Sequence, residues 1–496
     1  MFNGAINTVR RWLTKMGLLK EIASITEVKT LPIDEKFYSL INDWKSIYQG
    51  YYPEWHDVKY HTIDGTKRRR LNTLGMPKVV SQEMASLIFN EKCEINISDD
   101  AFGENVNKVL KDNRFYSQFQ SHLEFMFGMG GTVVKPYVEN DQIKLSYVTA
   151  DCFIPISWNN QGIFEGAFLF QTRKGKRYYT HIEFHLKTET GYRIKNELFE
   201  SENSGKLGHK VNIGVLYPDL EEEVIIDNLE RPLFVYFRPN IANNIDMTIP
   251  LGIPLYANAM DTLHSLDIAF DSFQREFRLG KKRILVPATA VKAVPDENGN
   301  LVRYFDATDE VYQAFTTGNL DNQKIYDNSV ELRVDEHISA INALLNLLAM
   351  QTGFSSGTFT FDGKGVKTAT EVVSENSKTF KSKQSHENII EAGIQELVET
   401  IKVLADLYNL FPTVDDYKVT VQFDDSIAED ENSEIDKQIK LVSSGLTSKK
   451  RAIMKIHGVT EEEALEIIQE IIQEERQQSP ELEELRAQSA LFGQEE

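Results

Sequence analysis

The segment LHSLDIAFDSFQREFRLG (residues 263–280) decides the fold of this chain. Its apolar side chains recur at steps of three and four residues, at Leu263, Leu266, Phe270, Phe273 and Phe277. That spacing places them on one narrow face of a helix and is typical of a seam between helices. The other side carries Asp267, Asp271, Gln274 and Arg278, which we expect to face water. Because proline is tolerated in a first turn and glycine often follows a helix end, we predict a helix over residues 253–280.

A β-rich insert and a second helix follow. Residues 284–287 (ILVP) predict a strand, and the turn signal DENGN at 296–300 allows the chain to return as a second strand over 301–305. The second helix begins near Glu336, and its apolar face consists of Ile338, Ile341, Leu345 and Leu348. Both apolar faces look too exposed to be buried within one copy. We therefore predict that neighbouring identical copies cover them.

A glycine-bearing loop then leads into a very long helix. The loop, FSSGTFTFDGKGV at residues 354–366, is predicted to be mobile. Thr368 and Glu371 fit a capping box, and no proline follows until Pro412. The first half of this helix is polar, and the second half carries a seam of Ile390, Ile394, Leu397, Ile401, Leu404 and Tyr408. A helix of this length with one polar half is expected to cross between regions or to line a cavity.

The N-terminal half predicts an α+β body. Helices are expected over residues 81–91 and 104–127, the latter ending at the glycines of residues 128–131. Alternating apolar residues then predict strands over residues 132–138, 143–148, 166–172, 178–186, 192–198 and 233–237, with a further strand over 417–423. Strands and helices do not alternate regularly, so helices covering an antiparallel or mixed sheet are favoured over a doubly wound fold.

The charge of the chain is strongly acidic and uneven. A net charge of −21 over 496 residues disfavours a conventional nucleic-acid binder, which neutralises phosphates with a basic surface. Residues 424–496 hold 8 Lys or Arg against 19 Asp or Glu. Within them, residues 460–478 predict a helix whose inward face consists of Ala464, Leu465, Ile468, Ile471 and Ile472.

The two cysteines and the N-terminus restrict the compartment. Cys93 and Cys152 are too few for a disulfide framework, and we predict buried thiols in a reducing compartment. Residues 1–20 form an amphipathic pattern that Arg10, Arg11 and Lys15 interrupt, which predicts neither a secretory signal nor a membrane span. This segment either docks on protein or lies on a membrane surface, and we favour docking.

Two apparent catalytic signatures fail on spacing or context. Residues 357–364 imitate a phosphate loop, but five residues separate Gly357 from Gly363 where four are needed. His181, Glu183 and His185 share one face of a strand, where they form either a metal site or, as we favour, a polar row facing solvent. We predict no catalytic residue, no cofactor-binding residue and no metal ligand, and hence a protein that is not an enzyme.

The order of elements resembles that of the portal proteins of tailed bacteriophages. Residues 445–464 (GLTSKKRAIMKIHGVTEEEA) and residues 44–90 are similar to segments of portals from phages with long non-contractile tails and Gram-positive hosts. The resemblance covers nearly the whole chain and implies an α/β wing, a two-helix stem, a small β-rich clip, a long kinked helix and an α-helical crown. The implied divisions are 1–252 wing, 253–280 first stem helix, 281–335 clip, 336–352 second stem helix, 353–367 tunnel loop, 368–442 long helix and wing completion, and 443–496 crown.

The resemblance also implies a function. A homo-oligomeric ring, a dodecamer in the virion, would form the channel for double-stranded DNA at the capsid vertex during packaging, retention and ejection. The implied partners are the terminase, the head-completion adaptor, the major capsid protein and the scaffolding protein, with assembly in the host cytoplasm and no membrane. The implied DNA-channel residues are Phe354, Thr358, Phe361, Lys364 and Lys367. Two alternatives remain: a nucleic-acid-processing enzyme such as a packaging ATPase or nuclease, and another connector or capsid protein of the virion.

Overall fold

The computed structural model describes residues 35–62, 65–280, 283–287, 293–295, 301–303, 312–315, 326–328, 331–361, 369–423, 431–457 and 459–478. Its chain divides into two units. The first consists of Met1–Gly363 and Lys381–Asp424, and the second of Lys364–Phe380 and Asp425–Glu496. The long helix predicted from the sequence therefore contributes its beginning to the second unit and the rest to the first.

The first unit begins with short helices and a hairpin. They are α2 (Glu35–Tyr48), α3 (Pro53–His56), the strands β1 (Asp57–Thr62) and β2 (Gly65–Arg70), α4 (Met76–Ile88), α5 (Asp100–Asp112) and α6 (Phe115–Met129). The single helix predicted over 104–127 is thus two helices. The break lies at Asn113, whose side chain donates to the carbonyl of Ile143 and accepts from the amide of Leu145, both at the start of the next hairpin. Gly130 ends α6 with φ 90, as predicted for a glycine terminator.

Antiparallel sheets pack against these helices, which supports the α+β class. The largest has the order β10-β9-β8-β7-β6, with β11 also paired to β9, and a three-stranded sheet has the order β12-β4-β5. The strands are β4 (Thr132–Glu139), β5 (Gln142–Thr149), β6 (Phe153–Trp158), β7 (Ile163–Lys174), β8 (Arg177–Lys187), β9 (Gly191–Ser201), β10 (His209–Val211), β11 (Glu223–Asp227) and β12 (Val235–Phe237). The predicted strands of the N-terminal half are confirmed, with ends that differ by a few residues.

The helix after these sheets starts later than predicted. It is α7 (Met260–Leu279), preceded by the 3-10 turn η3 (Ala257–Ala259). The expected start at residue 253 is wrong because residues 253–256 pack without helical bonds against the end of α6. There the amide of Leu255 donates to the carbonyl of Phe127, and the hydroxyl of Tyr256 donates to the carbonyl of Gly128.

The described residues of the insert form five short strands. They are β13 (Arg283–Pro287), β14 (Ala293–Pro295), β15 (Leu301–Arg303), β16 (Tyr312–Phe315) and β17 (Tyr326–Asn328). The predicted return strand is present as β15, but it pairs with β14, whereas β13 lies between β16, which is parallel to it, and the antiparallel β17. The pairing expected between residues 284–287 and 301–305 is therefore corrected. A strand of only three residues carries too little pattern to reveal its partner.

The chain then completes the first unit through α8 (Val334–Gln351), α9 (Ala369–Tyr408) and β18 (Val419–Gln422). β18 pairs with β3 (Glu94–Ile97), a strand more than three hundred residues earlier, which confirms the strand predicted over 417–423. The apolar half of α9 is buried as predicted, except for the exposed Tyr408. The polar half of α9 is not simply exposed to solvent, because Thr379, Lys383 and His386 are buried too. Thr368, the predicted cap, lies outside the described residues.

Three helices make up the described C-terminal part of the second unit. They are α10 (Glu431–Ser443), α11 (Lys449–His457) and α12 (Glu461–Gln478). The helix predicted over 460–478 is confirmed, and Thr460 and Glu463 form its capping box through two reciprocal bonds at 2.9 Å and 3.4 Å. Its predicted inward face is only partly correct. Ala464 is buried, whereas Leu465, Ile471 and Ile472 are exposed because α11 covers only one side of α12.

Candidate functional site

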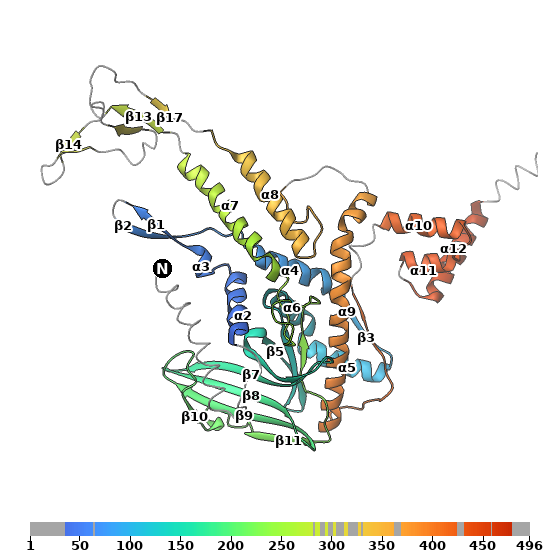
Figure 1. Ribbon diagram of the computed structural model, residues 1–496. Helices are drawn as coiled ribbons and strands as arrows, with labels where there is room; N and C mark the ends of the chain where they lie inside the picture. The colour runs from blue at the N-terminus through green and yellow to red at the C-terminus, as the bar shows by residue number, and fades with distance from the viewer. Residues whose placement is uncertain are drawn as a thin grey trace, which may run out of the picture. The chain divides into compact units, whose positions relative to one another are not determined.

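Helices α7 and α8 form an antiparallel pair within the first unit, and Figure 1 shows them side by side. Arg333, at the start of α8, donates two hydrogen bonds to Glu276, near the end of α7, at 3.1 Å and 2.9 Å. One turn further along, the rings of Phe273 and His337 lie 5.7 Å apart. These contacts hold the outer ends of the helices together at the point where the β insert begins and ends.

The predicted seam residues of this pair divide into two groups. Five are buried inside the single chain: Leu263, Leu266, Ile341, Leu345 and Leu348. They pack in the same core as α2, α4, α5 and α6, so the expectation that only a neighbouring copy covers them is corrected. The sequence pattern shows that a face is apolar, but it does not show whether the same chain supplies the partner. Phe270, Phe273 and Ile338 are half-buried, and Phe277 is 44% exposed.

Two aspartates of α7 are buried, against the expectation that they face water. Asp267 accepts from the ring Nε2 of His56 at 3.1 Å and from the amide of Leu74 at 2.8 Å. Asp271 accepts two bonds from the guanidinium of Arg69, at 2.8 Å and 2.7 Å. Burial opposes ionisation of Asp271, but the hydrogen bonds and charge of Arg69 outweigh it and lower the pKa of this carboxyl.

These contacts fasten residues 56–74, including the β1–β2 hairpin, to the stem helix. Trp55 strengthens the attachment by stacking on His264 of α7, with ring centroids 4.9 Å apart. The basic run of β2 is therefore largely engaged within the chain: Arg68 pairs with Asp57 at 2.7 Å and Arg70 lies over the ring of Tyr51. We call these contacts between residues 55–74 and α7 the clasp. The sequence did not predict it, although two aspartates four residues apart and a basic run are both present in the sequence.

The predicted channel loop is described as far as residue 361. Phe354 is fully buried against Phe359, so it does not line an open channel. Two amide side chains of α8 hold the turn that follows: Asn346 accepts from the amide of Gly357 at 2.7 Å, and Asn342 accepts from the amide of Phe361 at 3.1 Å. Phe361 is 61% exposed and Thr358 is also exposed. Lys364 and Lys367 lie outside the described residues.

The polar row of β8 is buried and engaged. Lys135 of β4 pairs with Glu183, and Glu183 also accepts from the Nε2 of His185 at 2.7 Å. The Nδ1 of His185 accepts from the hydroxyl of Tyr192 at 2.9 Å, and His181 bonds to Asn196 at 3.0 Å. The expectation of a solvent-facing row is wrong, because this face of β8 meets the three-stranded sheet. Within the described residues, no group of three or more His, Cys, Asp or Glu is placed to hold a metal ion.

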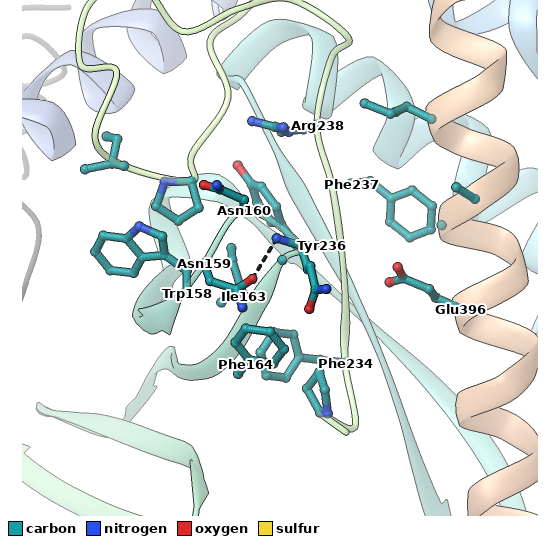
Figure 2. A pocket seen from close by; sticks show the side chains of 18 of the residues that line it. Trp158, Asn159, Asn160, Ile163, Phe164, Phe234, Tyr236, Phe237, Arg238 and Glu396 are labelled. Carbon is teal, nitrogen blue, oxygen red and sulfur yellow. Dashed lines mark hydrogen bonds between the residues drawn. The ribbon is translucent and has the colours of Figure 1, made fainter. Parts of the chain in front are cut away.

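A pocket of about 890 Å³ in the first unit lies between the turn after β6, the segment around β12 and α9. Figure 2 shows Trp158 and Glu396 on opposite sides of it. Burial raises the pKa of Glu396, and Arg231 opposes that rise. The lining joins aromatic rings, amide groups and two arginines, and we assign no reaction to it.

A comparison with protein-family models decides between the alternatives left by the sequence. The model described as phage portal protein, SPP1 Gp6-like, matches residues 29–478. The chain belongs to this family. The resemblance predicted from the order of elements is thereby confirmed. A comparison with curated proteins gave no match.

Membership gives the portal protein a coarse function. The family supports a phage portal role, is structural rather than enzymatic, and implies a homo-oligomeric ring in the virion, at the capsid vertex. In the described part of the portal protein, no helix combines the length and the apolar content needed to cross a membrane.

Proposed function

We propose that identical copies of this chain form a ring around a channel through which double-stranded DNA enters and leaves the capsid. One observation carries the proposal: helix α7, the β insert, helix α8, the loop and the long helix α9 follow one another in a chain that the portal family model matches over residues 29–478. A dodecamer is the expected form in the virion.

Contacts between copies are proposed to involve the part of the stem that its own chain leaves open. Phe277 and the half-buried Phe270, Phe273 and Ile338 lie toward the outer ends of the two helices. Burying an aromatic side chain of this kind contributes roughly 1.5–3 kcal/mol, and a ring repeats each contact at every interface. The five seam residues that are already buried contribute to the fold of each copy instead.

The turn at residues 353–361 is the proposed narrow part of the channel, with Thr358 and Phe361 facing it and Lys364 and Lys367 retained as expectations for phosphate contact. The acidity of the chain fits passive guidance of DNA. A strongly basic wall would hold the polyanion through counterion release, whereas an acidic wall lets the duplex slide. Hydrolysis of ATP would then belong to the terminase.

The remaining parts are assigned to partners by the same proposal. The insert over residues 281–335 would meet the terminase during packaging and the head-completion adaptor afterwards. The wing would meet the major capsid protein and the scaffolding protein during assembly in the host cytoplasm, and the C-terminal helices would form a crown toward the capsid interior.

Electron microscopy of the purified full chain tests the proposal. Rings with a central hole are expected, and a uniform monomer at micromolar concentration would overturn it. Deletion of residues 357–363 is expected to leave the rings intact but to impair packaging or retention of DNA in particles. Unchanged packaging by that variant would remove the loop from the mechanism while leaving the ring in place.

A further inference from the structure

The C-terminal helices of the second unit have almost no core of their own. Among the described side chains of residues 431–478, only Gln438, Ala452 and Ala464 are buried. Large apolar side chains remain open to solvent instead, with Ile439 58% and Leu446 76% exposed, and Leu465, Ile471 and Ile472 also exposed. Residues 431–478 are about fifty in number, and a helical segment of this size needs a well-filled core, a crosslink or a partner to be stable. This unit therefore requires a surface that covers its apolar side chains.

Local geometry fixes where these side chains point. Helix α10 ends in a Schellman turn, in which the amide of Leu446 donates to the carbonyl of Leu441 at 2.9 Å and Gly445 has φ 69. In such turns the apolar residue after the glycine usually packs back onto its own helix. Leu446 does not, because it is the most exposed large apolar side chain of the unit. It is thus held outward by a rigid turn.

Charge is segregated between the two helices that follow. Helix α11 (KKRAIMKIH) contains three lysines and one arginine and no acidic residue. Helix α12 (EEEALEIIQEIIQEERQQ) contains seven glutamates and one arginine. Lys449, Arg451 and Lys455 are exposed on α11, and Glu463 and Glu470 are exposed on α12. The unit therefore presents a cationic surface on α11 and an anionic surface on α12, and the exposed Leu465, Ile471 and Ile472 lie on α12 with the latter.

We propose that α11 of one copy docks on α12 of the next copy, so that the exposed apolar side chains of the unit are buried only in the assembled ring. This inference rests on the proposed function, which supplies the ring. The occupant is a second copy because one chain carries both complementary surfaces. In a cyclic ring every copy offers its α12 to one neighbour and its α11 to the other, so the same contact repeats until the ring closes. Complementary charges steer this contact, and like-charged surfaces oppose the wrong pairing.

Two full-length variants with reversed charge test the contact. The first carries Lys449→Glu and Arg451→Glu, which reverses two exposed charges and lowers the net charge of α11 from +4 to zero. The second carries Gln469→Lys and Glu470→Lys, which makes α12 more basic and spares Glu463, the residue of the capping box. At about 0.1 M salt, where charges interact over about 10 Å, each variant alone is expected to assemble with an apparent dissociation constant at least tenfold higher than that of the unaltered chain. Native mass spectrometry and sedimentation measure the assembly.

Mixing the two variants is the decisive experiment. In an alternating ring, the glutamates introduced on α11 of the first variant meet the lysines introduced on α12 of the second, and the unaltered α11 of the second meets the unaltered α12 of the first. Assembly is therefore expected to recover in the mixture. Repulsion between α11 and α12 inside one chain cannot be relieved by mixing, so failure to recover would overturn the proposal.

A matched control carries Lys78→Glu and Lys176→Glu, two exposed lysines of the first unit, and is expected to assemble as the unaltered chain does. Normal assembly of both α11 and α12 variants would also overturn the proposal, and would show that another protein covers this unit. Absence of rings from the unaltered chain is a different result, because it counts against the proposed function.

Discussion

The guanidinium of Arg69 donates to both carboxylate oxygens of Asp271, at 2.8 Å and 2.7 Å, and thereby joins the β1–β2 hairpin to the stem helix α7. Asp271 is almost completely buried, and the amide of Asn72 supplies a further bond at 3.2 Å. A buried carboxylate with a bidentate partner is costly to leave unpaired. The clasp therefore couples the position of the hairpin to that of the stem.

Replacement of Arg69 by Ala is expected to destabilise the first unit by roughly 2–3 kcal/mol, because it leaves Asp271 buried without its cation. Thermal unfolding followed by calorimetry measures the effect. Arg68→Ala is the matched control, since Arg68 pairs with Asp57 at an exposed site and its loss is expected to cost less than about 1 kcal/mol. Equal effects of the two variants would mean that the clasp adds nothing beyond a surface ion pair.

The periodicity of apolar residues in the sequence predicted α7, α8 and most of the strands in the first unit. The steps of three and four residues in α7 and α8, and the alternation in β4, β5, β7, β8 and β9, arise from local geometry, which any single chain displays. The start of α7 was missed because tertiary contacts decide it: residues 253–256 pack on the end of α6, and Pro254 fits that extended segment as well as a first helical turn.

Which polar residues are buried could not be predicted in the same way. Asp271 pairs with Arg69, and Lys135 pairs with Glu183, and the members of each pair come close only after folding. Lys383 pairs with Glu387 on the same helix, on a face whose burial the sequence pattern does not show. Lys135 offered a signal, because it interrupts the apolar run TVVKPYV in β4. Lys364 and Lys367, predicted to touch DNA, lie outside the described residues and remain predictions.

Lys135→Met is expected to destabilise the fold by roughly 3–5 kcal/mol and to move acid unfolding to higher pH. Burial raises the pKa of Glu183, but Lys135 and His185 outweigh it and hold the pKa well below its usual 4.5. This carboxylate therefore stabilises the fold above about pH 4.5, and the contribution is lost as pH falls below that value. Without Lys135 the pKa rises, so this carboxylate contributes less stability, and the less stable variant reaches its acid unfolding transition at higher pH.

The double variant Lys135→Met with Glu183→Leu separates the contribution of the ion pair to stability from that of side-chain packing. It removes both charges, so most of the lost stability is expected to return in denaturant titrations at neutral pH. A double variant no more stable than Lys135→Met would show that other contacts of the lysine, whose Nζ lies 5.4 Å from the ring centroid of Phe168 and 5.7 Å from that of Phe170, matter more than the ion pair.

His386 predicts a second pH dependence. Burial lowers its pKa from 6.5 to about 4, and its Nδ1 accepts from the amide of Asn240 at 3.0 Å, a bond that protonation of Nδ1 removes. The neutral ring thus contributes stability that is fully present above pH 6.5 and is lost as pH falls toward 4. His386→Gln keeps an acceptor but does not titrate. The difference in unfolding free energy between pH 7 and pH 5 should shrink by about 2 kcal/mol in this variant. An unchanged difference would contradict the assignment.

The loop after α8 is expected to open when its two amide anchors are removed. Asn342→Ala with Asn346→Ala deletes the bonds to Phe361 and Gly357, each worth about 1 kcal/mol. Chymotrypsin cleavage after Phe361 should then be at least tenfold faster, because the cleavable form becomes more populated. Ser339→Ala, at an exposed position of the same helix, is the control. Cleavage at the rate of the unaltered chain would show that the buried Phe354 alone holds the loop.

Some predicted seam residues of α7 are buried in their own chain and others are exposed. Two substitutions on this helix are therefore expected to have different effects. Leu266 is fully buried in its own chain, so Leu266→Asp places a charge in the core and is expected to unfold the first unit. Phe277 is 44% exposed, so Phe277→Asp should leave the melting temperature of the monomer within a few degrees of the unaltered value while weakening assembly at least tenfold. Circular dichroism and sedimentation distinguish the two effects. Intact rings from Phe277→Asp would mean that the outer end of α7 faces solvent or another partner, and that the stem contacts its neighbour elsewhere.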